Sequence, residues 1–402
     1  MSAAERIWKR PAAVGAALFL VSWAVCAVFA SHWPVPEPYG DGPEYLALAG
    51  NISRGAGFSV DGLTPAVYRP PLFAGLLGAW FKLGGGWVSF QCAAESAGVV
   101  AAYFLILEIL ESEALSAATA LFFFALNPIL FTQAACVVQE PLLFFLTSLS
   151  AWLTLRWLRK PDDRGAAAVG LAWGLTTLGK VVAWYAPLLL WGLWAAGRLW
   201  KKSLWRLSAR RAALVSLVFG ATLAPWTLRN YAQFRRLIVV NDQGAGALEW
   251  FVSRGTLSEA GGDAYVRELK ASPMSASEYK RRLLSYAAAH PRLTFLQILK
   301  NFFWFTQYNR EWFGRAAGLS MRWYVWLIPA LFFQLPLYAG LFLLGPRKDI
   351  GRTFLLAFYL LYWLEYAAYW GEPRFAVPVY ALLVGLGLRG LLGARLKAAR
   401  PV

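Results

Sequence analysis

Long apolar stretches alternate along the chain with shorter charged loops. The first stretch, from Pro11 to Pro36, carries no charge, follows Arg6, Lys9 and Arg10, and lacks the small-residue signature of a cleaved signal peptide. Further apolar stretches run near residues 87–110, 114–132, 138–155, 165–180, 181–197, 212–228, 323–345, 353–371 and 374–394. Because about 20 apolar residues cross a bilayer as a helix, the pattern predicts an all-α polytopic membrane protein with about ten or eleven transmembrane helices.

Composition agrees with this prediction. Hydrophobic residues fill 58% of the 402 positions and charged residues only 15%, whereas about a quarter of a soluble domain is charged. These values exclude a soluble enzyme, a disordered protein and a disulfide scaffold. Cys26, Cys92 and Cys136 show no ligand spacing, so we expect small buried side chains. His32 and His290 are the only histidines, which excludes a histidine-rich metal site but not a carboxylate-bound metal.

Basic residues in short loops predict the orientation. The formal net charge is +17. Apart from the N-terminal cluster, the basic loops and tail contain Arg156, Arg159, Lys160, Arg164, Arg198, Lys201, Lys202, Arg206, Arg210, Arg211, Arg347, Lys348, Arg352, Arg395, Lys397 and Arg400. In a ten-span chain they all fall on one side, which the positive-inside rule assigns to the cytoplasm. Segments 31–86 and 229–322 then face the exterior, and Leu293–Phe305 is either an interfacial helix or an eleventh span.

The first external segment carries two carboxylates at the start of a predicted short helix. In the run Asp41-Gly-Pro-Glu-Tyr, Asp41 fits an N-cap and Glu44, three residues later, fits a capping box. The alternative is a general base beside the membrane, because Asp41 is flanked by Tyr39 and Tyr45 and could reach a hydroxyl proton there.

Other charged residues lie at the ends of predicted spans on the same external face. They are Glu140, Lys180, Arg229, Glu372 and Arg374, and Arg69 lies on the same side just before a membrane-associated helix predicted to begin at Pro70. Charges at membrane depth are costly and usually functional. Carboxylates facing cations predict a site that binds an anionic headgroup and activates a hydroxyl. The alternative is a set of internal ion pairs and interfacial arginines that snorkel.

At these residues the sequence resembles the GT-C glycosyltransferases. It is most similar to bacterial members of glycosyltransferase family 39, which include protein O-mannosyltransferases, the lipid A aminoarabinose transferase and lipopolysaccharide-core transferases. The similar segments are Asp41-Gly-Pro-Glu-Tyr with the following Leu-Ala-Leu-Ala, Tyr68-Arg-Pro-Pro, Gln139-Glu140-Pro, Gly174-Leu-Thr-Thr-Leu-Gly-Lys180, Pro225-Trp-Thr-Leu-Arg-Asn-Tyr and Glu372-Pro-Arg-Phe-Ala-Val-Pro. Together they cover most of residues 35–235 and the last predicted span.

The resemblance implies a GT-C-like bundle in three parts. Residues 1–228 would form the transmembrane catalytic core with external loop 31–86, residues 229–322 an external loop with juxtamembrane helices, and residues 323–402 the C-terminal transmembrane helices. The sequence ends after its last predicted span, so the large external C-terminal domain of some relatives is expected to be absent.

The resemblance also implies an inverting glycosyltransferase. Its donor would be a polyprenyl-phosphate sugar, and its acceptor a cell-envelope glycan or lipid, such as lipopolysaccharide, outside a bacterial inner membrane. Carried onto this chain, the resemblance makes Asp41 the catalytic base, Glu140 the second acid and Lys180 the donor-phosphate ligand. The charge pattern adds Glu44 to the catalytic candidates, Arg69, Arg229 and Arg374 to the phosphate ligands, and Tyr45, Tyr68 and Glu372 as supporting residues. No cofactor is certain, and a divalent metal, if one binds, would join Asp41 and Glu140. Nucleic acid is not an expected partner.

Two features depart from the family. Many relatives carry adjacent Asp and Glu, whereas Gly42 and Pro43 separate them here, and Val181 and Val182 replace the usual proline after the lysine. The alternative from another class is a flippase or transporter of lipid-linked sugar. Transporters often show repeated halves with matching broken helices, and this sequence shows no such repeat.

Overall fold

The computed structural model describes residues 11–32, 40–199, 207–242, 244–305, 334–344, 349–369, 371 and 373–398. Throughout these ranges the elements are helices, and the only strand-like pairing is an isolated bridge between Ser59 and Pro65. The predicted all-α fold is therefore confirmed.

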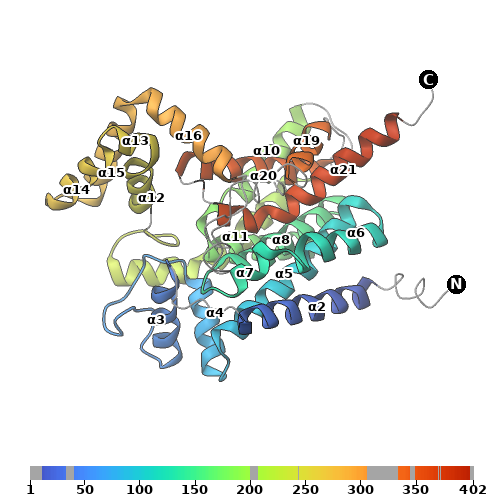
Figure 1. The fold of residues 1–402 in the computed structure, drawn as a ribbon, viewed down its shortest axis with the longest axis horizontal. Helices are drawn as coiled ribbons and strands as arrows, with labels where there is room; N and C mark the ends of the chain where they lie inside the picture. The colour runs from blue at the N-terminus through green and yellow to red at the C-terminus, as the bar shows by residue number, and fades with distance from the viewer. Residues whose placement is uncertain are drawn as a thin grey trace.

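Roughly parallel and antiparallel helices form the main bundle (Figure 1). Its members are α2 (Pro11–His32), α5 (Trp87–Leu110), α6 (Glu113–Ala120), α7 (Pro128–Ala134), α8 (Glu140–Arg159), α9 (Asp163–Gly179), α10 (Ala186–Leu199), α11 (Ala209–Phe234), α19 (Leu335–Leu343), α20 (Ile350–Tyr369) and α21 (Tyr380–Ala398). The start of α2 and the end of α21 lie at the same end of the bundle (Figure 1).

Two groups of shorter helices cover the opposite end (Figure 1). The first comprises α3 (Gly42–Ser53) and α4 (Pro71–Lys82), which share an apolar core around Tyr45, Leu48 and Phe73. The second comprises α12 (Gly244–Ser253), α13 (Gly255–Glu259), α14 (Gly262–Ala271), α15 (Ala276–Ala289) and α16 (Pro291–Phe305), with a core of their own around Val252, Leu257 and Leu283. Both groups belong to the segments predicted to be external.

Five segments of the described chain are long and apolar enough to cross a membrane. They are α2, α5, α8, α11 and Arg374–Gly393. The predicted stretch 114–132 is not one continuous α-helix, because a π-helical turn at Leu121–Ala125 separates α6 from α7. Lys180 divides the region 165–197 into α9 and α10, with a short 3-10 turn at Val181–Ala183 between them. The predicted span 323–345 lies mostly outside the described residues, so ten spans remain a prediction.

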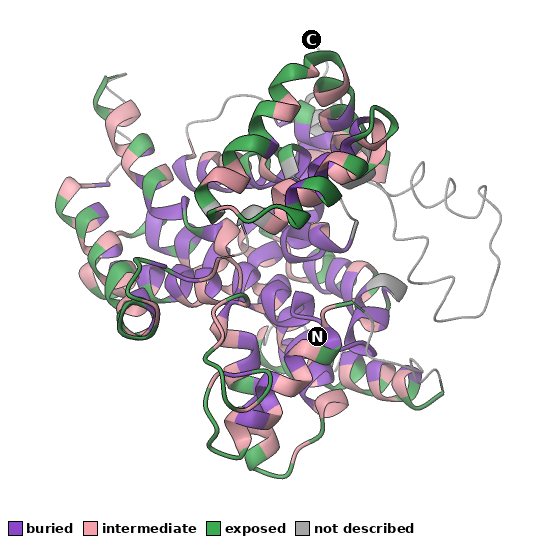
Figure 2. Ribbon diagram, turned by 90° about the vertical axis from the view of Figure 1, so that its left-hand side faces the viewer, coloured by how far each residue is buried: buried purple, intermediate pink, exposed green. Residues whose placement is uncertain are grey.

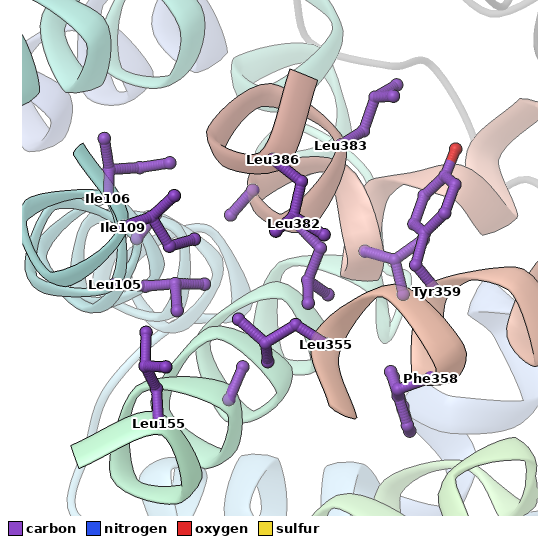
Figure 3. Close-up of a cluster of buried hydrophobic side chains, with 14 of the residues drawn as sticks. Leu105, Ile106, Ile109, Leu155, Leu355, Phe358, Tyr359, Leu382, Leu383 and Leu386 are labelled. Carbon is purple, nitrogen blue, oxygen red and sulfur yellow. The ribbon is translucent and has the colours of Figure 1, made fainter. Parts of the chain in front are cut away.

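Aliphatic and aromatic side chains from four helices form the centre of the bundle. Figure 3 shows Leu105, Ile106 and Ile109 of α5 and Leu155 of α8 facing Leu355, Phe358 and Tyr359 of α20 and Leu382, Leu383 and Leu386 of α21. Figure 2 shows the buried residues gathered inside the helical layers and the exposed ones on their outer faces. Lipid tails are as apolar as these side chains, so close packing rather than exclusion of water holds such helices together.

Small residues allow one helix pair to approach very closely. Gly170 and Gly174, four residues apart on α9, face Val215 and Thr222 of α11. A Cβ atom on Gly170 would lie 2.5 Å from the carbonyl oxygen of Val215, and one on Gly174 would lie 2.7 Å from Cβ of Thr222. This spacing of glycines is the usual signature of close helix pairs in membranes.

The basic loops converge on a carboxylate at the end of the bundle away from α3 and α4. Glu111 lies 2.9 Å from Arg352, 3.6 Å from Arg389 and 3.8 Å from Arg159. Glu108, one turn earlier, pairs with Arg159 as well. These contacts join the ends of α5 and α8 to the start of α20 and to Arg389 within α21, so Arg159 and Arg352, two of the basic residues predicted to share one side, lie together.

We predict that Gly170→Ala destabilises the protein by about 1–3 kcal/mol, because the added methyl group meets backbone that cannot rotate away. Gly192→Ala on α10 is the matched control, since nothing lies within 4 Å of its Cβ position, and it should be neutral or slightly stabilising. Thermal unfolding in detergent measures both variants. Equal unfolding midpoints for the two would contradict the close packing of α9 on α11.

Candidate functional site

Asp41 stands at the N-cap position of α3 but does not cap the helix. Its carboxylate accepts no hydrogen bond from the first turn, although Pro follows early in the helix as predicted. The expected capping box is therefore wrong, and both carboxylates of this turn are directed elsewhere.

The partner of both carboxylates is Arg69, which precedes α4. Its guanidinium lies 2.9 Å from Asp41 and 2.7 Å from Glu44, and its Nε donates a further hydrogen bond of 2.8 Å to Glu44. The arginine side chain is only 12% exposed, whereas that of Asp41 is 29% exposed. Burial alone would lower the pKa of Arg69, but Asp41, Tyr45 and Glu44 outweigh that effect and raise the pKa above its ordinary value. Arg69 thus stays charged and bridges two acids.

A second arginine reaches the same carboxylate from the C-terminal part of the chain. Arg374 belongs to a 3-10 segment, Pro373–Val379, that leads into α21. Its guanidinium lies 3.7 Å from the other oxygen of Asp41, and its side chain is 8% exposed. Asp41 therefore lies between two arginines that are more than 300 residues apart in sequence, and its exposed fraction leaves it open to solvent.

Glu140 and Lys180 form the second ion pair of the site. Glu140 is the first residue of α8 and has a side chain only 2% exposed; Nζ of Lys180 lies 3.4 Å from it. Lys180 directly follows the last residue of α9 and has an extended backbone. The end of α9 therefore places the lysine beside the start of α8. Its Nζ also lies 3.9 Å from the ring centre of Phe375, next to Arg374. An ammonium over an aromatic face is attracted to the ring.

Tyr45 connects the two ion pairs. Its ring is buried against Phe73 and its hydroxyl donates a 2.8 Å hydrogen bond to Gln139, the residue before Glu140. The guanidinium of Arg69 lies over the same ring, 5.5 Å from its centre. Burial raises the pKa of Tyr45 well above its ordinary value, so the hydroxyl keeps its proton and its hydrogen bond. Its expected supporting role therefore has a specific contact.

Gln91 on α5 was not expected from the sequence, and it fixes the segment before Glu140. Its side-chain amide donates hydrogen bonds to the carbonyl oxygens of Cys136 and Val138, at 2.5 and 2.7 Å. The residue is completely buried. A glutamine within a predicted span is a signal that could have suggested this role, because uncompensated polar groups are rare there.

The remaining predicted residues are placed differently. The ring of Tyr68 lies under the guanidinium of Arg69, 5.0 Å from its carbon, and is partly exposed. Arg229 donates to the carbonyl oxygens of Ala66 and Phe58, and it makes no ion pair or hydrogen bond to a described acidic residue of the site. Glu372 lies outside the described residues.

The divalent metal stays a prediction. Within the described ranges, no group of three or more His, Cys, Asp or Glu side chains is arranged to hold a metal ion. Asp41 and Glu140 each have a basic partner.

The assembled site contains three carboxylates and three cations. Asp41, Glu44 and Arg69 come from the α3–α4 region, Glu140 and Lys180 from the bundle, and Arg374 from the segment before α21. A partly exposed carboxylate between arginines can accept a proton from a hydroxyl, and adjacent cations can bind a phosphate. Of the predicted catalytic and phosphate-binding residues that the structure describes, the fold brings all but Arg229 together.

A family model for dolichyl-phosphate-mannose-protein mannosyltransferase matches residues 48–238. Among solved structures, the chain is similar to the archaeal oligosaccharyltransferase AglB from Archaeoglobus fulgidus, solved with an inhibitory peptide and a dolichol-phosphate. The TM-score is 0.55 at 14% identity, over 100% of this chain and 53% of that one, so the chain spans about half the length of AglB. No curated protein sequence matches.

The predicted resemblance to GT-C glycosyltransferases is confirmed. The family match includes Arg69, Glu140 and Lys180 but begins after Asp41 and Glu44. The GT-C-like fold brings these two acids to the matched segment through Arg69.

We predict that Lys180→Met destabilises the protein by about 3 kcal/mol, because Glu140 would remain buried without its cation. The double variant Glu140→Gln/Lys180→Met should recover most of that loss, since no net charge stays buried. Thermal unfolding of the two variants and the wild type measures the difference. A double variant as unstable as Lys180→Met would show that the pair is not what stabilises this junction.

Proposed function

We propose that the protein is an inverting glycosyltransferase that uses a polyprenyl-phosphate sugar as donor. The observation that carries the proposal is the position of Asp41 between Arg69 and Arg374, next to the Glu140–Lys180 pair. The GT-C-like fold and the family match over residues 48–238 support the same reaction class.

The donor phosphate would bind to the cations of the site. Lys180 and Arg374 are the best placed, because both flank the ring of Phe375 and Lys180 has only a 3.4 Å contact to Glu140. Arg69 presents a planar fork suited to phosphate oxygens. Their charges would stabilise the negative charge that develops on the leaving phosphate.

The reaction then balances without a cofactor. The carboxylate of Asp41 accepts the proton of an acceptor hydroxyl, and the acceptor oxygen forms a bond to the anomeric carbon. The bond between that carbon and the phosphate oxygen breaks, and its electron pair leaves with the polyprenyl phosphate. Attack from the face opposite the phosphate inverts the anomeric configuration. A phosphate leaves without protonation, so Glu44 and Glu140 act here by orienting the cations.

Donor binding would also activate the base. In the structure the carboxylate of Asp41 lies 2.9 Å from the guanidinium of Arg69 and 3.7 Å from that of Arg374. A phosphate that draws either arginine away removes part of this stabilisation, and a carboxylate that loses a cationic partner becomes a better proton acceptor. Proton transfer is thereby coupled to the presence of the donor.

The acceptor would be a cell-envelope glycan or lipid, such as lipopolysaccharide, on the outer side of a bacterial inner membrane. The orientation rests on the basic residues gathered at the opposite end of the bundle around Glu111. A lipid acceptor and a lipid donor could both approach along the bilayer to the site beside α3 and α4.

We predict that Asp41→Asn lowers transfer by about 10²- to 10⁴-fold while undecaprenyl phosphate binds at least as tightly as to the wild type. Lys180→Ala is the matched contrast and should weaken that binding about tenfold or more, because a charge-assisted contact is lost. The assays are native mass spectrometry of purified protein with undecaprenyl phosphate, and transfer from polyprenyl-phosphate sugars extracted from the source membranes. Near-normal transfer by Asp41→Asn would remove it from the base role, and unchanged affinity in Lys180→Ala would remove the phosphate contact.

A further inference from the structure

The loop that ends at Arg69 is held by a row of three hydrogen bonds. The carbonyl oxygen of Ala66 accepts from Arg229 at 2.7 Å, that of Val67 from the backbone N–H of Asp242 at 3.3 Å, and that of Tyr68 from the side-chain amide of Asn241 at 3.1 Å. The three acceptors are consecutive and directly precede Arg69. The loop backbone is thus fixed up to the residue that bridges Asp41 and Glu44.

Arg229 is itself fixed on α11. Its guanidinium lies over the ring of Trp226, 4.7 Å from the centre, and donates to the side-chain oxygen of Asn230 at 3.0 Å. A second N–H reaches the carbonyl oxygen of Phe58 at 3.4 Å, at the other end of the same loop. Phe58 O also accepts from the backbone N–H of Ala66. Both terminal nitrogens of Arg229 therefore donate to loop carbonyls.

The segment that carries Asn241 is tied to the same helix. After α11 the chain reverses at Arg235, a non-glycine residue in the left-handed region with φ of 52°. Trp226 donates to the carbonyl oxygen of Val240 at 2.6 Å, and the fully buried Asn230 donates to that of Ile238 at 2.9 Å. Residues 238–242 therefore lie back along α11, which presents Asn241 to Tyr68.

We propose that Arg229 and Asn241 are positioning residues that set the guanidinium of Arg69 between Asp41 and Glu44. Arg229 holds Ala66 and Asn241 holds Tyr68, so together they determine where the backbone of Arg69 lies. We call Arg229, Asn241 and their hydrogen bonds to the loop the clamp. The residue after Asn241 connects the clamp to the external helices, because the carboxylate of Asp242 lies 3.6 Å from Lys280 of α15. Arg229 acts through Arg69 and not on the phosphate.

This inference rests on the proposed function for its catalytic consequence. A displacement of about 1 Å at a reacting group lowers turnover by up to about 10²-fold. Loss of one of the clamping hydrogen bonds should thus lower the turnover number more than it weakens binding of undecaprenyl phosphate.

A double-mutant cycle between Asn241→Ala and Arg69→Ala tests the proposal. Asn241→Ala should lower turnover roughly tenfold in the wild-type background and cause no further loss in the Arg69→Ala background. Asp263→Ala on α14 is the control, because its carboxylate pairs with Arg267 of the same helix, and its turnover should stay within about twofold of wild type. Arg229→Lys, which loses the two-carbonyl fork, should behave like Asn241→Ala.

The same cycle is measured by thermal unfolding, which needs no substrate. Asn241→Ala should lower the unfolding midpoint more in the wild type than in Arg69→Ala. If the wild type transfers no sugar, the proposed function fails. The thermal-unfolding cycle alone then tests whether Asn241 and Arg229 position Arg69. Equal effects of Asn241→Ala in both backgrounds, in turnover and in unfolding, would overturn the proposal.

Discussion

The cost of holding charge against apolar helices governs how this protein is built. An unpaired carboxylate or ammonium in a low-dielectric setting is strongly disfavoured, and removing one member of a buried pair costs about 3–5 kcal/mol. At the site end three carboxylates therefore face three cations, with Arg69 bridging Asp41 and Glu44 and Lys180 beside Glu140. A site balanced in this way is stable without substrate, yet it can exchange a carboxylate partner for a phosphate of the same sign.

The helices determine where the charged side chains of the second ion pair lie. Glu140 is the first residue of α8 and Lys180 follows the last residue of α9, so both lie where helices end instead of in the apolar middle. Tyr45 donates to the side chain of Gln139, and Gln91 donates to the carbonyl oxygens of Cys136 and Val138, so both residues fix the segment that precedes Glu140. Polar residues inside the bundle thus act on the site without reaching it.

The sequence predicted the parts of this arrangement that depend on composition and on local pattern. The long apolar stretches predicted the helical class and the positions of α2, α5 and α8. The charged residues expected on one membrane face predicted that Asp41, Arg69, Glu140, Lys180 and Arg374 would lie together. It failed where tertiary contacts decide the outcome. Spacing alone made Asp41 a helix cap, because a capping box and an ion pair with a distant arginine have the same local sequence. The local sequence likewise did not show that Arg229, predicted as a phosphate ligand, donates to the carbonyl oxygen of Ala66, 163 residues earlier.

We propose above all that the paired charges support transfer of a sugar from lipid phosphate to a hydroxyl. Its most direct measurement uses purified protein in liposomes with polyprenyl-phosphate sugars extracted from the source membranes and an envelope glycolipid extract. Released polyprenyl phosphate and sugar incorporated into the acceptor are quantified together. We expect equal amounts of both, with an inverted anomeric configuration in the product. Intact lipid-linked sugar moved to the opposite leaflet, with no polyprenyl phosphate released, would contradict it and identify a flippase.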